Sequence, residues 1–310
     1  MLTTILLTKN NQETLAKTLE SLPLNSDILI GDRNSVDQTR KIASKYRAKI
    51  VLINTNNLAK ARNTLIDQAE TEWIFSLEPW EILVNGLPTC TDPKAYSFQI
   101  VNNHVITKET RLWHRKLGFH YENPVYESLL SDNPIFFDKA LIYSTTHQDD
   151  IEEKLRMLAD WSQECPTLAV PHYYRAFIHL EHKEYKEFFS EANQFLFQDG
   201  SGIPATMLRY YLAMTSLYIY KDADRAKQAL LPCLMVYPLM AEFWCLLGDI
   251  HYQQHLYVKA ASFYENAVLL GTRRLKSDSW PMDLTKYKKY PSKMIDNCQK
   301  MLTGTKLFKH

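Results

Sequence analysis

The chain has 310 residues, of which 45% are hydrophobic, and this length and composition allow roughly two domains with sizeable cores. They exclude disorder as the general state of the chain. Basic residues exceed acidic residues by 36 − 35 = 1, so the chain lacks the overall positive charge that favours a nucleic-acid partner. The five cysteines are scattered and include no CxxC pair, which predicts reduced thiols and argues against a structural zinc site.

The N-terminal apolar run is short, follows no basic residue and gives way to polar residues after Leu7. This pattern indicates a first β-strand rather than a signal peptide. No apolar stretch approaches the ~18 to 20 residues that span a bilayer. We therefore expect a cytoplasmic protein without a transmembrane segment, with peripheral association with a membrane as an open alternative.

Four short apolar runs alternate with helical patterns in the first part of the chain. The runs, at residues 2–7, 28–30, 50–53 and 73–77, are typical of strands buried on both faces of a parallel sheet. The intervening patterns, at residues 15–22, 42–46 and 58–69, place apolar side chains on one face of a helix. This alternation predicts an open α/β sheet, with ligands expected at the carboxyl ends of its strands.

The pattern changes twice further along the chain. Residues 95–101, 111–115 and 140–144 indicate additional strands, and from residue 149 the chain is helical almost to its end. We therefore predict an α/β domain over residues 1–148 and an α-helical domain over residues 149–310.

The helical part contains an internal repeat. One copy has the residue order of a tetratricopeptide unit, a helical hairpin with a period of ~34 residues, in Trp244, Leu247, Gly248, Tyr257, Ala260, Tyr264 and Ala267. A matching set lies one period earlier, a degenerate third copy covers residues 173–196, and a plain helical bundle is the alternative. Because so few repeats bury little surface among themselves, we expect this domain to be stabilised by contact with the first domain, with a protein partner or with a second copy of the chain.

The first half resembles the family-2 glycosyltransferases. The segments TTILLTKNNQETLAKTLESL, ILIGDRNSVDQTRKIASKY, NLAKARNTLIDQA and WIFSLEPWEIL follow the order and spacing of that family's motifs, and RLWHR and NPVYESLL resemble segments of a bacterial branch that carries C-terminal tetratricopeptide hairpins. The resemblance implies a Rossmann-like GT-A domain that binds a nucleotide-diphosphate sugar. It also implies inverting transfer of the sugar to an acceptor hydroxyl or another nucleophile, on a protein, peptide or glycan.

The resemblance implies four donor-binding residues. Asp32 matches an Asp that accepts a hydrogen bond from the nucleotide base, although it is also placed to cap a turn. Arg62 and Arg111 match basic residues of the ARN and RLFR-type segments and suit phosphate oxygens, although charged residues on a helix or strand are more often solvated. Glu78 keeps the charge of the first Asp of the DxD-type motif.

The LEPWE segment departs from the family's pattern. Trp80 stands in place of the second Asp of the DxD-type motif, and its side chain offers only an N–H donor and cannot ligate Mg2+ or Mn2+. Three alternatives follow: Glu81 holds the divalent metal, positive side chains replace the metal, or the site has lost catalysis.

Glu127 matches the Glu of the family's HE segment and is the candidate general base, with a surface glutamate as the alternative and Asp132 as a weaker substitute. The sequence is thus compatible with two functions. One is an active glycosyltransferase, and the other is a catalytically degenerate relative that acts as a protein-interaction module through its helical repeats. A nucleotidyltransferase is disfavoured because no Gly-rich loop follows the first strand.

Overall fold

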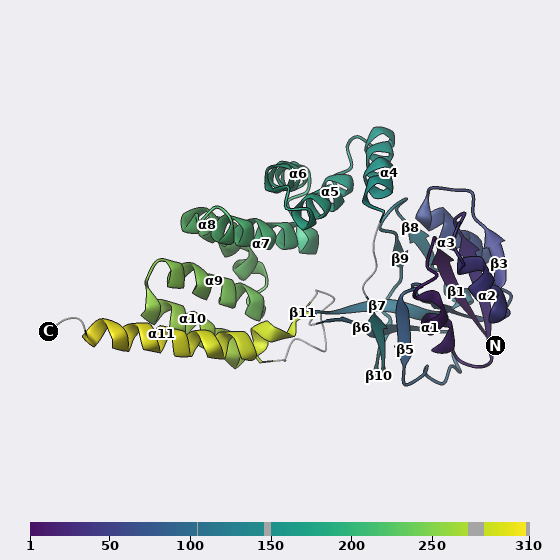
Figure 1. The fold of residues 1–310 in the computed structure, drawn as a ribbon, viewed down its shortest axis with the longest axis horizontal. Helices are drawn as coiled ribbons and strands as arrows, with labels where there is room; N and C mark the ends of the chain where they lie inside the picture. Colours follow the sequence, from purple (N-terminus) through teal and green to yellow (C-terminus); the bar gives the residue numbers. More distant parts are fainter. Residues whose placement is uncertain (104, 146–149, 272–281, 308–310) are drawn as a thin grey trace. The chain divides into compact units, whose positions relative to one another are not determined.

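The computed structural model describes residues 1–103, 105–145, 150–271 and 282–307 (Figure 1). The chain divides into two compact units, residues 1–161 and residues 162–310. The fold class is the predicted one, an α/β unit followed by a helical unit.

The four predicted parallel strands are all present in the first unit. They are β1 (Leu2–Thr8), β2 (Ser26–Asp32), β3 (Lys49–Leu52) and β4 (Trp73–Ser76), and they lie side by side in the order β3-β2-β1-β4. Each neighbouring pair is parallel. Their carboxyl ends therefore share one edge of the sheet, as the sequence pattern predicts.

Helices cover both faces of this parallel half. They are α1 (Leu15–Glu20), α2 (Thr39–Lys45) and α3 (Leu58–Gln68). The core on one face joins Leu6 of β1 to Leu15 and Ala43 of α1 and α2. The core on the other face joins Ile5 of β1 to Leu65 of α3. Alternate residues of β1 thus face opposite cores, which explains why its sequence is a continuous apolar run.

The sheet continues beyond β4 with strands of mixed direction. They follow in the order β7 (Val105–His114), β6 (Ala95–Asn102), β10 (Ile135–Ser144) and β5 (Glu81–Val84). A separate hairpin pairs β8 (His120–Glu122) with β9 (Ser128–Leu130). The strand predicted over residues 111–115 is the end of β7, except that Arg115 begins a 3-10 turn, Arg115–Leu117.

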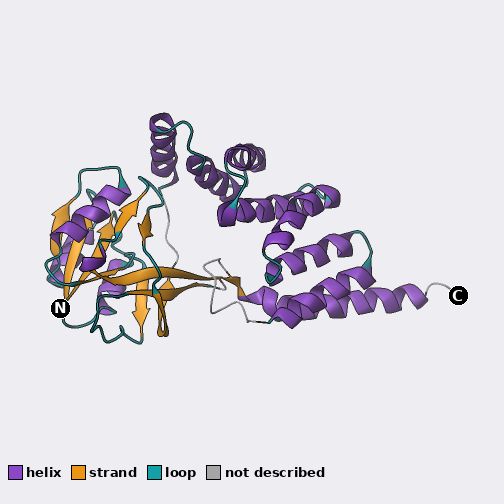
Figure 2. Ribbon diagram, turned by 180° about the vertical axis from the view of Figure 1, so that it is seen from behind, coloured by secondary structure: helices purple, strands orange, loops and turns teal. Residues whose placement is uncertain are grey.

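The remaining described elements are mostly helical (Figure 2). They are α4 (Ile151–Glu164), α5 (Val170–Glu181), α6 (Tyr185–Gln198), α7 (Gly202–Tyr218), α8 (Ala223–Val236), α9 (Ala241–Gln253), α10 (Tyr257–Leu270), the short strand β11 (Met282–Asp283), a 3-10 turn (Leu284–Tyr287) and α11 (Lys289–Leu307).

The predicted repeats form helical hairpins. Helix α5 packs on α6, α7 on α8 and α9 on α10. The hairpin of α5 and α6 contains the degenerate third copy at residues 173–196. A Cβ atom on Gly248 of α9 would lie only 2.6 Å from the Tyr264 ring of α10. The glycine of the repeat pattern is therefore required for close approach of the two helices of its hairpin.

The boundary between the two compact units lies within α4, between residues 161 and 162. The sequence instead predicts a domain boundary between residues 148 and 149. The difference has a structural cause, because Glu153 in the first turn of α4 forms ion pairs with Lys9 and Arg33 of the α/β unit. The assignment of domains to residues 1–148 and 149–310 stays a prediction.

Candidate functional site

Arg62 joins three elements at the carboxyl edge of the sheet. Helix α3 begins after Asn57, whose side chain accepts a hydrogen bond from the Lys60 amide, and this start places Arg62 one turn into the helix. Its Nη2 donates to both carboxylate oxygens of Glu78, at 2.7 and 2.8 Å. Its Nε donates to Oε1 of Glu127 at 2.5 Å. The predicted ARN arginine, the first acid of LEPWE and the candidate base therefore meet in one network.

Arg111 extends this network from β7. Strand β7 runs antiparallel to β4 with Leu112 opposite Phe75, so Arg111 reaches the segment that follows β4. Its Nη2 donates to Oε1 of Glu81 at 2.8 Å, and its Nη1 lies 3.5 Å from Oε1 of Glu78. The other Glu81 oxygen accepts from the Glu78 amide at 2.9 Å. We call Arg62, Arg111, Glu78, Glu81 and Glu127 the guanidinium–carboxylate cluster.

The two acids of LEPWE have different proton affinities. Burial raises the pKa of Glu81 to about 7, with the Glu78 charge adding to the effect and the Arg111 charge opposing it. Burial also disfavours the charged form of Glu78, but Arg62 and Arg111 together outweigh it and hold the Glu78 pKa below its ordinary value. Glu78 is therefore the firmly ionised member of the pair.

Tyr121 and Asn63 support the cluster, and the sequence reasoning missed both. The Tyr121 ring centroid lies 5.3 Å from the Arg62 guanidinium carbon, a cation–π contact, and the Tyr121 hydroxyl donates to Ser76. The Asn63 side chain binds the Tyr121 backbone through both its nitrogen and its oxygen, at 2.9 and 2.8 Å. Asn63 could have been found from the ARN motif, because it directly follows Arg62 on α3.

The backbone next to Glu127 is in an unfavourable conformation. Tyr126 has φ = 53°, in the left-handed region that bulky residues rarely adopt. The Lys154 ammonium of α4 lies 4.5 Å from the Tyr126 ring centroid. Such conformations persist where the surrounding structure stabilises them, and they are frequent at functional sites. Here the strained residue directly precedes the candidate base in the chain.

Asp32 belongs to a different network at the end of β2. Its side chain is fully buried, and Oδ2 accepts from the Ser35 amide at 3.1 Å and lies 3.6 Å from Nε of Arg40. Among the described residues, Oδ1 has no hydrogen-bond partner. The structure thus shows the turn-forming role for one oxygen and leaves the second oxygen for another group.

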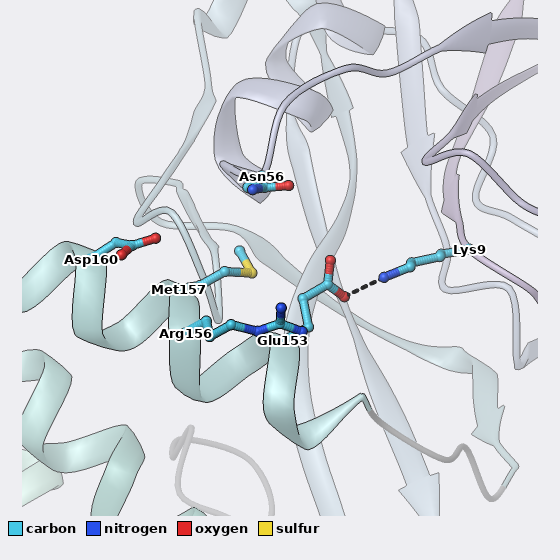
Figure 3. A pocket seen from close by; sticks show the side chains of 6 residues that line it. All are labelled: Lys9, Asn56, Glu153, Arg156, Met157 and Asp160. Carbon is cyan, nitrogen blue, oxygen red and sulfur yellow. Dashed lines mark hydrogen bonds and ion pairs between the residues drawn. The ribbon is translucent and has the colours of Figure 1, made fainter.

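A pocket of about 230 Å³ lies beside these loops (Figure 3). It is lined by Lys9 and Asn56, which follow β1 and β3, and by Glu153, Arg156, Met157 and Asp160 of α4. Glu153 accepts from Lys9 at 2.8 Å, the contact drawn in Figure 3, and from Arg33 at 2.7 Å. The sequence reasoning did not find this pocket, because no motif marks the α4 side chains that complete it.

The other candidates lie outside the cluster. Asp132 is exposed, and the Trp80 carbonyl accepts hydrogen bonds from Thr145. Over the described ranges, no group of three or more His, Cys, Asp or Glu side chains is placed to hold a metal ion. No helix in the described part of the chain is long and apolar enough to cross a membrane.

The first part of the chain matches a known protein family. Residues 3–78 match the family described as Glycosyl transferase family 2. This confirms the resemblance to that family over a segment that contains Asp32, Arg62 and Glu78. No curated protein matches the chain.

Several solved structures are similar to this chain. TarS 1–349 from S. aureus, solved in complex with UDP-GlcNAc, has 14% identity over 96% of this chain and 92% of its own, with a TM-score of 0.37. MamA 41-end from Desulfovibrio magneticus RS-1 has 17% identity over 52% of this chain and 88% of its own, with a TM-score of 0.37.

Proposed function

We propose that this protein is an inverting glycosyltransferase that moves a sugar from a nucleotide-diphosphate sugar to an acceptor hydroxyl or another nucleophile. The observation that carries the proposal is the ion-pairing of Arg62 with both Glu78 and Glu127. Arg62 and Glu78 belong to the segment that matches the family-2 glycosyltransferases, and Glu127 lies outside it in the sequence. The contact supports the proposal because it joins Glu127, the proposed base, to a residue of the segment that matches that family.

Glu127 is the proposed general base. An acceptor hydroxyl must lose a proton as it attacks the anomeric carbon, and a carboxylate close to the donor is suited to take it. The Glu127 side chain is only 9% exposed, and its Oε1 accepts a hydrogen bond from Nε of Arg62 at 2.5 Å. This contact holds the Glu127 carboxylate beside Arg62, one of the proposed donor-binding residues.

The donor would lie at the carboxyl edge of the parallel strands, the usual ligand position in this class of sheet. The free Oδ1 of Asp32 is proposed to accept a hydrogen bond from the nucleotide base, because a buried oxygen without a partner is costly. Arg62 and Arg111 are the proposed phosphate-binding groups, since a guanidinium matches phosphate oxygens in geometry and charge.

A donor screen tests this function. The full chain is incubated with UDP-, GDP-, CDP- and ADP-sugars, with and without simple glycan and peptide acceptors, and release of the nucleoside diphosphate is measured. We expect one nucleotide class to be cleaved and the new glycosidic bond to have the inverted configuration by NMR. The absence of both cleavage and nucleoside-diphosphate binding for every donor would refute the proposal.

One observation favours the second candidate, a degenerate transferase that acts as an interaction module. The altered motif carries Trp80, and the carboxylates of Glu78 and Glu81 are both engaged by arginines. Nucleotide binding without turnover in the donor screen would support this candidate. Binding of an acceptor or a protein partner by the helical repeats, or self-association through them, stays a prediction.

A further inference from the structure

We propose that this site binds the nucleoside diphosphate without a divalent metal, with the guanidinium groups of Arg111 and Arg62 in the metal's place. The inference rests on the proposed glycosyltransferase function and adds to it how the leaving group is held. It chooses among the three alternatives that the LEPWE segment raises, and it sets aside Glu81 as a metal ligand.

The available oxygens do not suit Mg2+ or Mn2+. A hard divalent ion such as Mg2+ takes about six oxygen ligands, and Trp80 supplies none at the position of the second motif acid. Both oxygens of Glu78 accept from Arg62. One oxygen of Glu81 accepts from Arg111 and the other from the Glu78 amide. A metal ion at any of these oxygens would have to share it with a donor that is already bound.

The two guanidinium groups also oppose a metal ion at the motif carboxylates. They lie within 3.5 Å of these carboxylates, and each also pairs with a further carboxylate, that of Glu127 at 2.5 Å or that of Glu109 at 3.0 Å. A divalent cation at the same carboxylates would stand a few ångströms from both guanidinium groups, where repulsion between like charges is strong because the site is buried. Arg62 and Arg111 are 6% and 7% exposed and are therefore weakly screened by water.

Both arginines keep a donor for the ligand. Nη1 of Arg62 and Nε of Arg111 are shielded from solvent and, among the described residues, have no hydrogen-bond partner. A buried donor without a partner is unfavourable, and a phosphate oxygen would satisfy it with a charge-assisted hydrogen bond. The carboxylates fix the orientation of each guanidinium while these nitrogens are left for the diphosphate.

This arrangement accounts for the electrons in the transfer step. The bond between the anomeric carbon and the β-phosphate oxygen breaks, and its electron pair stays on that oxygen, which gains negative charge. The acceptor oxygen forms the new bond to the anomeric carbon and gives its proton to Glu127. The fixed positive charges of Arg111 and Arg62 stabilise the charge on the leaving oxygen, the role that a metal would otherwise have.

Calorimetric titration of the full chain tests the proposal. UDP, GDP, CDP and ADP are titrated first in EDTA and then in Mn2+, and free Mn2+ is followed separately by electron paramagnetic resonance. We expect at least one nucleotide to bind with dissociation constants that agree within about threefold in the two conditions, a difference below 0.7 kcal/mol. The Mn2+ signal should be unchanged when the protein is added.

A variant identifies the groups responsible. Arg111→Met should weaken nucleotide binding in EDTA by about 10- to 100-fold, the scale of a lost charge-assisted hydrogen bond. Arg47→Met, at an exposed position, is the matched control and should bind as the parent chain does. Far-ultraviolet circular dichroism shows whether each variant is folded.

The outcomes separate this inference from the function on which it rests. Nucleotide binding that appears only in Mn2+, or that tightens more than tenfold, would overturn metal independence and leave the glycosyltransferase proposal intact. Unchanged affinity in a folded Arg111→Met variant would overturn the role of Arg111. Failure of all four nucleotides to bind in either condition would refute both proposals.

Discussion

Nη2 of Arg62 donates to both carboxylate oxygens of Glu78, at 2.7 and 2.8 Å, across the gap between α3 and the segment after β4. The contact joins residues 16 positions apart in the sequence that belong to two separate motifs. It fixes Glu78 as an ionised group and keeps Arg62 beside Glu127.

Removal of the Arg62 charge should therefore destabilise the fold. Arg62→Met removes the ion pair of the buried Glu127 and leaves Glu78 only its longer contact with Arg111, which costs about 3 to 5 kcal/mol of unfolding free energy. Lys60→Met is the matched control, because Lys60 lies on the same helix and is exposed. Urea unfolding of the full chain measures both, and a loss below about 1 kcal/mol for Arg62→Met would show that the network contributes little.

The cluster also predicts a pH dependence of stability. The Glu81 pKa is raised from 4.5 to about 7 in the folded chain, so between these values the folded state binds more protons than the unfolded state. The stability from this group is present at low pH and is lost as pH rises through about 7.

Glu81→Gln removes that titration. The variant should gain in melting temperature relative to the parent chain as the pH rises from 5.5 to 8, because only the parent chain must ionise a buried carboxyl group. Differential scanning calorimetry at several pH values measures the difference. A difference that does not change with pH would indicate that Glu81 is already ionised at pH 5.5.

Asp32 should affect ligand binding more than folding. Asp32→Asn keeps one oxygen for the Ser35 amide but replaces the other, unpartnered oxygen by a donor. Nucleoside-diphosphate affinity should fall by about 1 to 3 kcal/mol, the scale of a hydrogen bond to a charged group. The exposed Asp27 of the same strand gives the control, Asp27→Asn. Equal affinities of a folded Asp32→Asn variant and the parent chain would remove Asp32 from the binding site.

Gly248 offers a test of the repeat unit. Alanine favours a helix over glycine by about 1 kcal/mol, but the new methyl group would lie 2.6 Å from the Tyr264 ring. That ring is fully buried, and its hydroxyl donates to Asp249 at 2.5 Å, so it has little freedom to move. Gly248→Ala should therefore destabilise the chain by about 1 to 3 kcal/mol, as overpacked cores do. Chemical unfolding decides the sign, and net stabilisation would contradict the packing argument.

The sequence predicted the parts of the fold whose apolar residues form a clear pattern. Strands β1 to β4 are continuous apolar runs, and the repeat hairpins have aromatic and small residues at regular spacing. Strand β5 was missed because it begins with the buried acid Glu81, whose charge is compensated by Arg111 from elsewhere in the chain. Strands β8 and β9 are only three residues long, too short for a period to show.

The sequence predicted which residues belong to the candidate site but not which of them contact one another. The motifs gave Arg62, Glu78 and Glu127 separately, and only folding shows that Arg62 binds both acids. The Arg111 contact depends on the antiparallel register of β7 against β4, which strand patterns alone do not specify. The same holds for Glu153, because its partners Lys9 and Arg33 lie more than 100 positions away.

In the proposed sugar transfer, Glu127 removes the proton of the acceptor. With the donor found in the screen, turnover and donor affinity are measured for the parent chain, for Glu127→Gln and for Glu122→Gln, an exposed glutamate in β8 that serves as the control. We expect Glu127→Gln to lower kcat by about 100-fold or more, the scale of general-base catalysis, with donor affinity close to that of Glu122→Gln. Turnover by a folded Glu127→Gln variant equal to that of the control would contradict this role of Glu127.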